Sequence, residues 1–173
     1  MEAIRLPKTV EAEPDAAGLA HELTARARPL WVGGAVSVAR ADLTPALEAA
    51  LTSARSAGRI VRGLEAADRT LAMEARGLRR VDRKTGIERG VRVSRLLILA
   101  DDGADRFYRN VEALLHREGP RVLALRVSAD ERALGQLLFG SDHVVRLLLV
   151  EHKDAVSAVL MALAAHWATA PGA

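Results

Sequence analysis

The residues best suited to chemistry in this chain are arginines gathered in one middle segment. The chain has 173 residues and a formal net charge of +3. Residues 62–95 contain ten basic and five acidic side chains, whereas the segments on either side are balanced or slightly acidic. A guanidinium group presents a planar fork of donors that matches phosphate oxygens. The segment therefore predicts a surface for a polyanion, with a solvated and charged loop as the alternative interpretation.

Patterns for catalysis or metal binding are weak by comparison. Cysteine is absent, and neither the five histidines nor the serines and threonines have the spacing of a zinc site or a nucleophile elbow. Asp101, Asp102 and Asp105 follow an apolar run, where carboxylates could hold Mg²⁺. Capping of a helix N-terminus by Asp102 or Asp105 is the better interpretation. We therefore expect no enzymatic activity, no cofactor and no metal.

Apolar runs alternate with helix-like stretches in the second half of the chain. The runs are residues 96–100, 122–127 and 144–150. The helix-like stretches are residues 106–117, 130–138 and 154–167. Near-continuous apolar runs of this length are typical of strands that helices cover on both faces. The expected fold class is α/β, as a three-layer α/β/α sandwich around a small mixed sheet of about four strands.

A helix entrance is recognisable in the first half of the chain. Thr44 is a suitable N-cap, and Pro45 fits the first helical position because its missing N–H would be unpaired there. This helix should end near Gly58. A short strand at 59–62 and a second helix at 65–75 are expected to follow.

Two segments fall outside this alternation. Residues 1–40 are interpreted as an N-terminal arm or accessory segment with a strand at 30–38, and residues 41–173 as the α/β/α domain. Within that domain, residues 77–94 form a basic insertion that is too polar and glycine-rich for a core element. A hairpin with its tip at 84–86, or a mobile loop, is expected there.

The last helix-like stretch, residues 154–167, is apolar nearly all round. Such a helix is buried on more than one side, so it is either sandwiched in the core or shared with a second copy of the chain. No apolar stretch is long enough to span a bilayer, and the N-terminus lacks the pattern of a secretory signal. We expect a cytoplasmic protein that does not contact a membrane.

The order of these elements matches a known family. A helix, a short strand ending at Gly63 and a second helix precede three strand–helix pairs, and Leu134-Gly135 in the second pair is followed five residues later by Gly140. With this order and this Leu-Gly helix, residues from about 46 to 165 resemble the kink-turn-binding ribosomal protein superfamily. The resemblance implies an α/β/α fold, RNA binding and association with the ribosome.

The resemblance also implies where RNA would bind. In that family a glycine turn opens a helix whose first turn contacts RNA through an Asn-Glu pair and a lysine. Here the turn corresponds to Gly63; Glu65 and Ala66 stand in the places of the pair, and Arg69 stands in the place of the lysine. The family's second contact loop corresponds to residues 140–143.

Two functions follow from these patterns. In the first, the protein is a non-catalytic, ribosome-associated protein that binds structured RNA through phosphate contacts. In the second, it is a structural or regulatory interaction module, homodimeric through its apolar C-terminal helix, whose arginines meet an acidic protein. The candidate RNA-binding residues are Gly63, Glu65, Arg69, Arg76, Arg79, Arg80, Arg83, Lys84, Arg89 and Arg92.

Overall fold

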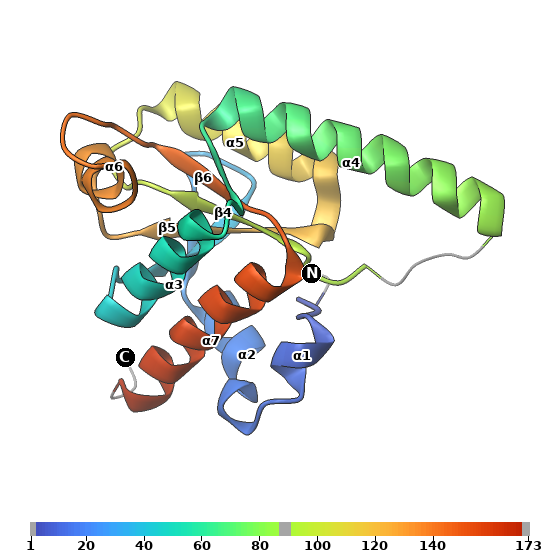
Figure 1. The fold of residues 1–173 in the computed structure, drawn as a ribbon, viewed down its shortest axis with the longest axis horizontal. Coiled ribbons are helices and arrows are strands. Elements are labelled where there is room, and N and C mark those ends of the chain that lie inside the picture. The colour runs from blue at the N-terminus through green and yellow to red at the C-terminus, as the bar shows by residue number, and fades with distance from the viewer. Residues whose placement is uncertain (1–2, 87–90, 171–173) are drawn as a thin grey trace.

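A single mixed β-sheet organises the chain. The structure is a computed structural model that describes residues 3–86 and 91–170. Within these residues six strands follow one another across the sheet in the order β1-β2-β5-β4-β6-β3 (Figure 1). Strands β2, β5 and β4 are parallel, whereas the β1–β2, β4–β6 and β6–β3 pairs are antiparallel. The strands are β1 (Ala27–Pro29), β2 (Ser37–Ala41), β3 (Ile60–Arg62), β4 (Arg95–Leu99), β5 (Val122–Val127) and β6 (Leu147–Val150).

The α/β class is confirmed, but a sheet of about four strands is too small. The described residues contain six strands, because the first 41 residues contribute β1 and β2. The strand expected at 30–38 is instead the turn between these two strands, with Gly33 at a φ of 89°, followed by the start of β2. Both strands are short and lie at or next to a sheet edge, so they lack the apolar run from which a strand is usually recognised.

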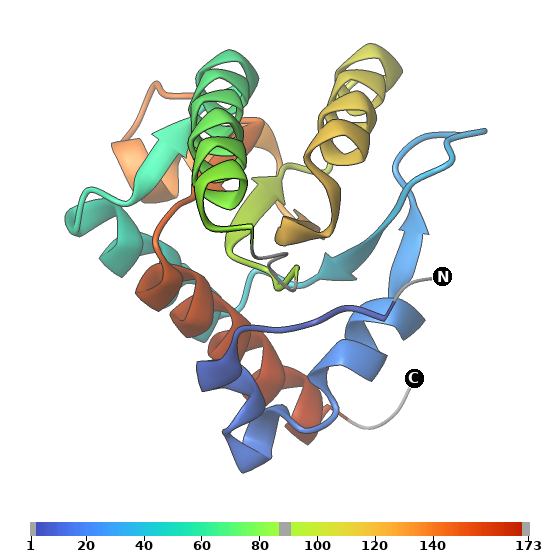
Figure 2. The same ribbon diagram turned by 90° about the vertical axis from the view of Figure 1, so that its right-hand side faces the viewer.

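Helices cover both faces of the sheet (Figure 2). Helices α4 and α5 pack on one face, and the remaining helices pack on the other. Strand β4 supplies both cores because side chains alternate along a strand: Leu96 and Ile98 join one cluster, and Leu97 and Leu99 join the other. The α-helices are α1 (Lys8–Glu11), α2 (Leu19–Ala25), α3 (Pro45–Ser56), α4 (Leu64–Thr85), α5 (Asp105–Glu118), α6 (Glu131–Phe139) and α7 (Lys153–Thr169), with short 3-10 helices η1 (Pro14–Ala16) and η2 (Gly119–Arg121).

Helix α7 is buried by the chain's own N-terminal segment. Helices α1, α2 and α3 and the turn η1 all contact α7. Val10, Leu19 and Leu23 of the N-terminal segment belong to the same buried cluster as α7. The apolar character of α7 therefore reflects burial within one chain. No helix in the described ranges is both long enough and apolar enough to cross a membrane.

Helix α4 differs most from the sequence-based expectation. It continues through Gly77 to Thr85, so the hairpin expected with its tip at 84–86 is wrong. Gly86, with a left-handed φ of 63°, is the glycine that ends the helix, and its N–H donates to the carbonyl of Asp82. Gly77 is a helical residue in open space. As a result the second half of α4 extends beyond the sheet (Figure 1).

Replacement of Gly77 by alanine is expected to stabilise the protein. A Cβ at this position would meet nothing within 4 Å, so the substitution only removes the conformational freedom of glycine. The free energy of unfolding should rise by about 0.5–1 kcal/mol. Urea denaturation followed by circular dichroism measures this change, and a loss of stability would mean that residue 77 is not helical.

Candidate nucleic-acid interface

The outer side of α4 is lined with arginines. Ala67 and Leu71 bury the inner side of the helix. At 3.6 residues per turn, the four arginines at positions 69, 76, 80 and 83 fall within an arc of about 60° and along about 21 Å of helix. Arg79 and Lys84 flank this line, and all six side chains are exposed. We call Arg69, Arg76, Arg79, Arg80, Arg83 and Lys84 the arginine face.

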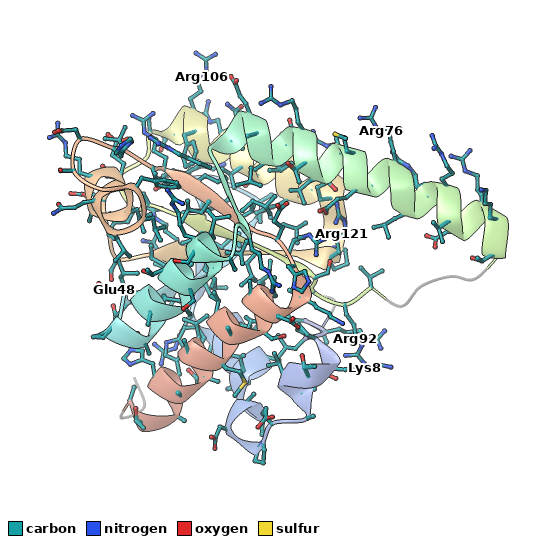
Figure 3. The ribbon with its side chains drawn as sticks, in the orientation of Figure 1. Lys8, Glu48, Arg76, Arg92, Arg106 and Arg121 are labelled. Atoms are coloured by element: carbon teal, nitrogen blue, oxygen red, sulfur yellow. The ribbon has the colours of Figure 1, made fainter. Side chains whose placement is uncertain are left out.

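Two carboxylates of α4, Asp68 and Glu74, pair with arginines of other elements and not with this face. Glu74 accepts hydrogen bonds from Arg95 Nε at 3.1 Å and from Arg121 Nη1 at 3.1 Å. Asp68 forms an ion pair with Arg117 of α5. Figure 3 shows one arginine of each kind. Arg76 of the arginine face projects away from the molecule, whereas Arg121, which binds Glu74, lies below α4.

The arginine face is therefore an uncompensated positive surface. Within the described ranges, Arg69, Arg76 and Arg80 form no ion pair, and Arg83 Nε donates only to the carbonyl of Arg79 at 3.4 Å. Arg76 and Arg80 are four residues apart on one helix, where like charges destabilise by a few tenths of a kcal/mol. A bound polyanion would remove this repulsion.

The turn that opens α4 lies beside the loop at 140–143. Gly63 has a φ of 91° and donates its N–H to the carbonyl of Leu147 at 2.9 Å. Arg62, immediately before the turn, donates from Nη2 to the carbonyl of Val144 at 2.8 Å, and its Nη1 lies 3.2 Å from His143 Nδ1. The two contact regions that the resemblance implies are thus neighbours, and Glu65 is exposed in the first turn of α4.

One of the predicted residues, Arg92, does not belong to this surface. Arg92 donates from Nη1 to the carbonyl of Leu6 at 2.8 Å and to Glu11 at 2.7 Å, so it holds the N-terminal segment in place (Figure 3). Arg89 lies outside the described residues. Within the described residues, the predicted insertion therefore contains a helical part that contributes to the face and Arg92, which packs on the N-terminal segment.

Of the three aspartates after β4, Asp102 has a structural partner. Asp102 Oδ1 accepts the N–H of Glu131 at 3.0 Å, so it caps the start of α6 and not the start of α5, which the sequence predicts. Asp105 is the first residue of α5, whose N-terminus has no side-chain cap. Across the described part of the chain, no group of three or more histidine, aspartate and glutamate residues is placed to hold a metal ion.

Comparison with known proteins leaves the function to be argued from these residues. No family model matches the chain, and no curated protein matches it in sequence. Among solved structures, the chain is similar to a protein of unknown function from Bacillus halodurans C. The two are 15% identical with a TM-score of 0.40, over 69% of this chain and 96% of the other.

Proposed function

We propose that the protein binds structured RNA through the arginine face of α4 and contacts phosphate groups with little sequence specificity. The observation that carries this proposal is the division of charge on α4: Asp68 and Glu74 are engaged by arginines of other elements, while the arginine face has no carboxylate partner in the described chain. Hydrogen bonds between guanidinium groups and phosphate oxygens are among the strongest in proteins because both partners are charged. Such contacts need no particular base sequence.

The order of the elements supports the same proposal. From α3 to α7 the helices and strands alternate as the resemblance to the kink-turn-binding superfamily implies, in a three-layer α/β/α arrangement. The Gly63 turn and the loop at 140–143 lie together, as two parts of one RNA surface must. On this proposal the protein is non-catalytic, cytoplasmic and associated with the ribosome.

The alternative, a homodimeric interaction module, loses its main support. It relied on an apolar α7 available to a second copy, but α1, α2, α3 and η1 already contact that helix. The competition assay described below tests whether the arginine face instead binds an acidic protein.

Binding to RNA should weaken steeply as salt rises. With about four phosphate contacts, log affinity should fall against log salt with a slope of about −3 to −4. This predicts a loss of about 100-fold between 50 and 200 mM salt. Filter binding of a structured RNA pool across this salt range measures the slope.

A competition assay separates the two kinds of partner. An acidic peptide, such as polyglutamate, is added at equal total charge while the RNA is held by the protein. RNA binding that polyglutamate displaces only weakly supports the proposal. No RNA binding even at low salt, or displacement by polyglutamate as effective as by unlabelled RNA, would contradict it and favour an acidic protein.

A further inference from the structure

A second cluster of arginines lies at the opposite end of the sheet. Arg40 of β2 and Arg126 of β5 stand directly opposite each other on parallel neighbouring strands. Arg28 of β1 pairs with Val38, two residues before Arg40, so it lies on the same face of the sheet. We call Arg28, Arg40 and Arg126 the sheet-edge arginines. Helix α4 packs against β3 and β6, so this cluster is separate from the arginine face.

Two hollows meet at the sheet-edge arginines. One, of about 640 Å³, is also lined by His21, Ser128 and Trp167. The other, of about 670 Å³, is also lined by Trp31 and Tyr108. All three arginines line both hollows, and each hollow is within the range of sizes that hold small organic ligands.

The path of the chain places this cleft where α/β proteins bind ligands. Strand β4 leads into α5 on one face of the sheet, whereas β2 and β5 lead into α3 and α6 on the other. Connections that leave toward opposite faces open a crevice outside the carboxyl ends of the parallel strands. Residues within two positions of these strand ends, Asp42, Asp101 and Ser128, line the 640 Å³ hollow.

None of the sheet-edge arginines forms an ion pair with a carboxylate in the described residues. Arg126 donates from Nη1 to the carbonyl of Leu30 at 3.1 Å and from Nη2 to the carbonyl of Asp101 at 2.8 Å. Its Nε is buried without a hydrogen-bond partner in the described chain. Arg28 donates only to carbonyl oxygens, and the Arg40 side chain forms no hydrogen bond or ion pair among the described residues.

This arrangement costs stability unless an anion is present. Like charges directly opposite each other on neighbouring strands are destabilising, and Arg40 and Arg126 have this relation. Arg126 cannot swing away, because two carbonyls hold it and it stacks on Tyr108 with its Cζ 4.4 Å from the ring centroid. A fixed guanidinium with an exposed one beside it is a preorganised site for a doubly charged oxyanion.

The carboxylates around the cleft indicate which groups the ligand carries besides its anionic group. Glu22 is paired with Arg26, and Asp42 Oδ2 lies 3.7 Å from His166 Nε2. Asp42 and Asp101 beside one hollow, and Asp105 beside the other, are exposed and can accept hydrogen bonds. Asp42 already accepts one from Ser128 at 3.4 Å. Acceptors beside an oxyanion site suit a ligand with hydroxyl groups, because these donate while its phosphate binds the arginines.

We propose that the sheet-edge arginines bind a small phosphate monoester that bears hydroxyl groups. A free sugar phosphate and a mononucleotide share this chemistry. The phosphate lies between Arg40 and Arg126, and the hydroxylated part lies in the 640 Å³ hollow near Asp42 and Ser128. Neither this ligand nor its site depends on RNA binding by α4.

Isothermal titration calorimetry with three probes tests the proposal: ribose 5-phosphate, adenosine 5′-monophosphate and inorganic phosphate. The variant is Arg40→Gln, because Arg40 is exposed and its side chain has no hydrogen bond or ion pair to lose in the described residues. Arg126 is left intact because it holds the carbonyls of Leu30 and Asp101. Arg80→Gln on α4 is the matched control, with the same chemical change on the arginine face.

The wild-type protein is expected to bind at least one ester with a Kd of about 1 mM or tighter. Arg40→Gln should weaken this binding by about 10-fold or more, and Arg80→Gln should leave it unchanged. The ester that binds more tightly then shows whether the ligand is a sugar phosphate or a mononucleotide. Absence of binding by both esters, equal binding of inorganic phosphate, or an equal loss in Arg80→Gln would overturn the proposal.

A melting experiment provides an independent readout. Without ligand, Arg40→Gln should melt at a higher temperature than the wild type, because it removes a like charge opposite Arg126. A lower melting temperature would show that Arg40 supports the fold and would overturn its assignment to a ligand. In an RNA-binding assay the two variants should exchange roles: Arg40→Gln should leave the affinity unchanged, and Arg80→Gln should weaken it. Failure of the phosphate-ester proposal can therefore be distinguished from failure of the RNA-binding proposal.

Discussion

Simultaneous replacement of Arg69, Arg76 and Arg80 by glutamate should lower the affinity for structured RNA by at least about 100-fold at low salt. Each charged hydrogen bond to phosphate contributes about 1.5–3 kcal/mol, and each new carboxylate adds repulsion. The three side chains lie on one line of α4, are exposed and have no ion-pair partner in the described residues. Filter binding against a structured RNA pool measures the loss.

The fold should tolerate this triple substitution. The replaced side chains point away from the core, and surface changes of this kind usually alter stability by less than about 0.5 kcal/mol. The residual salt dependence should also be shallower by about three units of log–log slope, because three phosphate contacts are lost. Circular dichroism and urea denaturation confirm that the variant is folded before its affinity is compared.

A matched triple variant controls for net charge. Lys8, Arg132 and Lys153 are exposed in the first turns of α1, α6 and α7, where glutamate is favourable because of the helix dipole. Their replacement by glutamate changes net charge equally but leaves the arginine face intact. An equal loss of RNA affinity in both variants would show that only overall charge matters, and α4 would then not be the binding surface.

The sequence predicts the α/β alternation from α3 onward well and the edge of the sheet formed by β1 and β2 poorly. Strand β5 covers the predicted residues 122–127, and α3 begins as expected, with the Thr44 hydroxyl accepting the N–H of Leu47 at 3.2 Å. These elements carry strong local signals, namely an apolar run and a capping residue. The strand expected at 30–38 overlaps only the first two residues of β2, and β1 is not predicted, because partners distant in sequence, such as β5, stabilise short segments that have no long apolar run of their own.

The sequence also predicts the candidate interface only in part. Composition located the arginines, but the glycines at 77 and 86 favoured a loop, although only Gly86 has the left-handed backbone that ends a helix. The spacing of Arg69, Arg76, Arg80 and Arg83 was the available signal for a helix, since these positions share one side at 3.6 residues per turn. The sheet-edge arginines gave no comparable signal, because Arg40 and Arg126 meet only through the pairing of β2 with β5.

Replacement of Gly135 by alanine should be the most destabilising single-methyl change in α6. A Cβ at this position would lie 1.9 Å from the carbonyl oxygen of His143 and 2.9 Å from the N–H nitrogen of Val144. The obstacle is backbone, which cannot rotate aside as a side chain can, so α6 and the segment at 143–144 must separate. We expect a loss of about 3 kcal/mol in the free energy of unfolding, measured by urea denaturation.

The comparison with Gly77→Ala isolates the cause of this loss. Both substitutions add one methyl group to a helical glycine, and alanine is the better helix former at both positions. Gly77 lies in open space, whereas Gly135 is buried against the loop after α6. The two changes should therefore have opposite signs. If Gly135→Ala were neutral, residues 143–144 would not pack on α6, and the loop at 140–143 would lose its place beside the Gly63 turn that opens the arginine face.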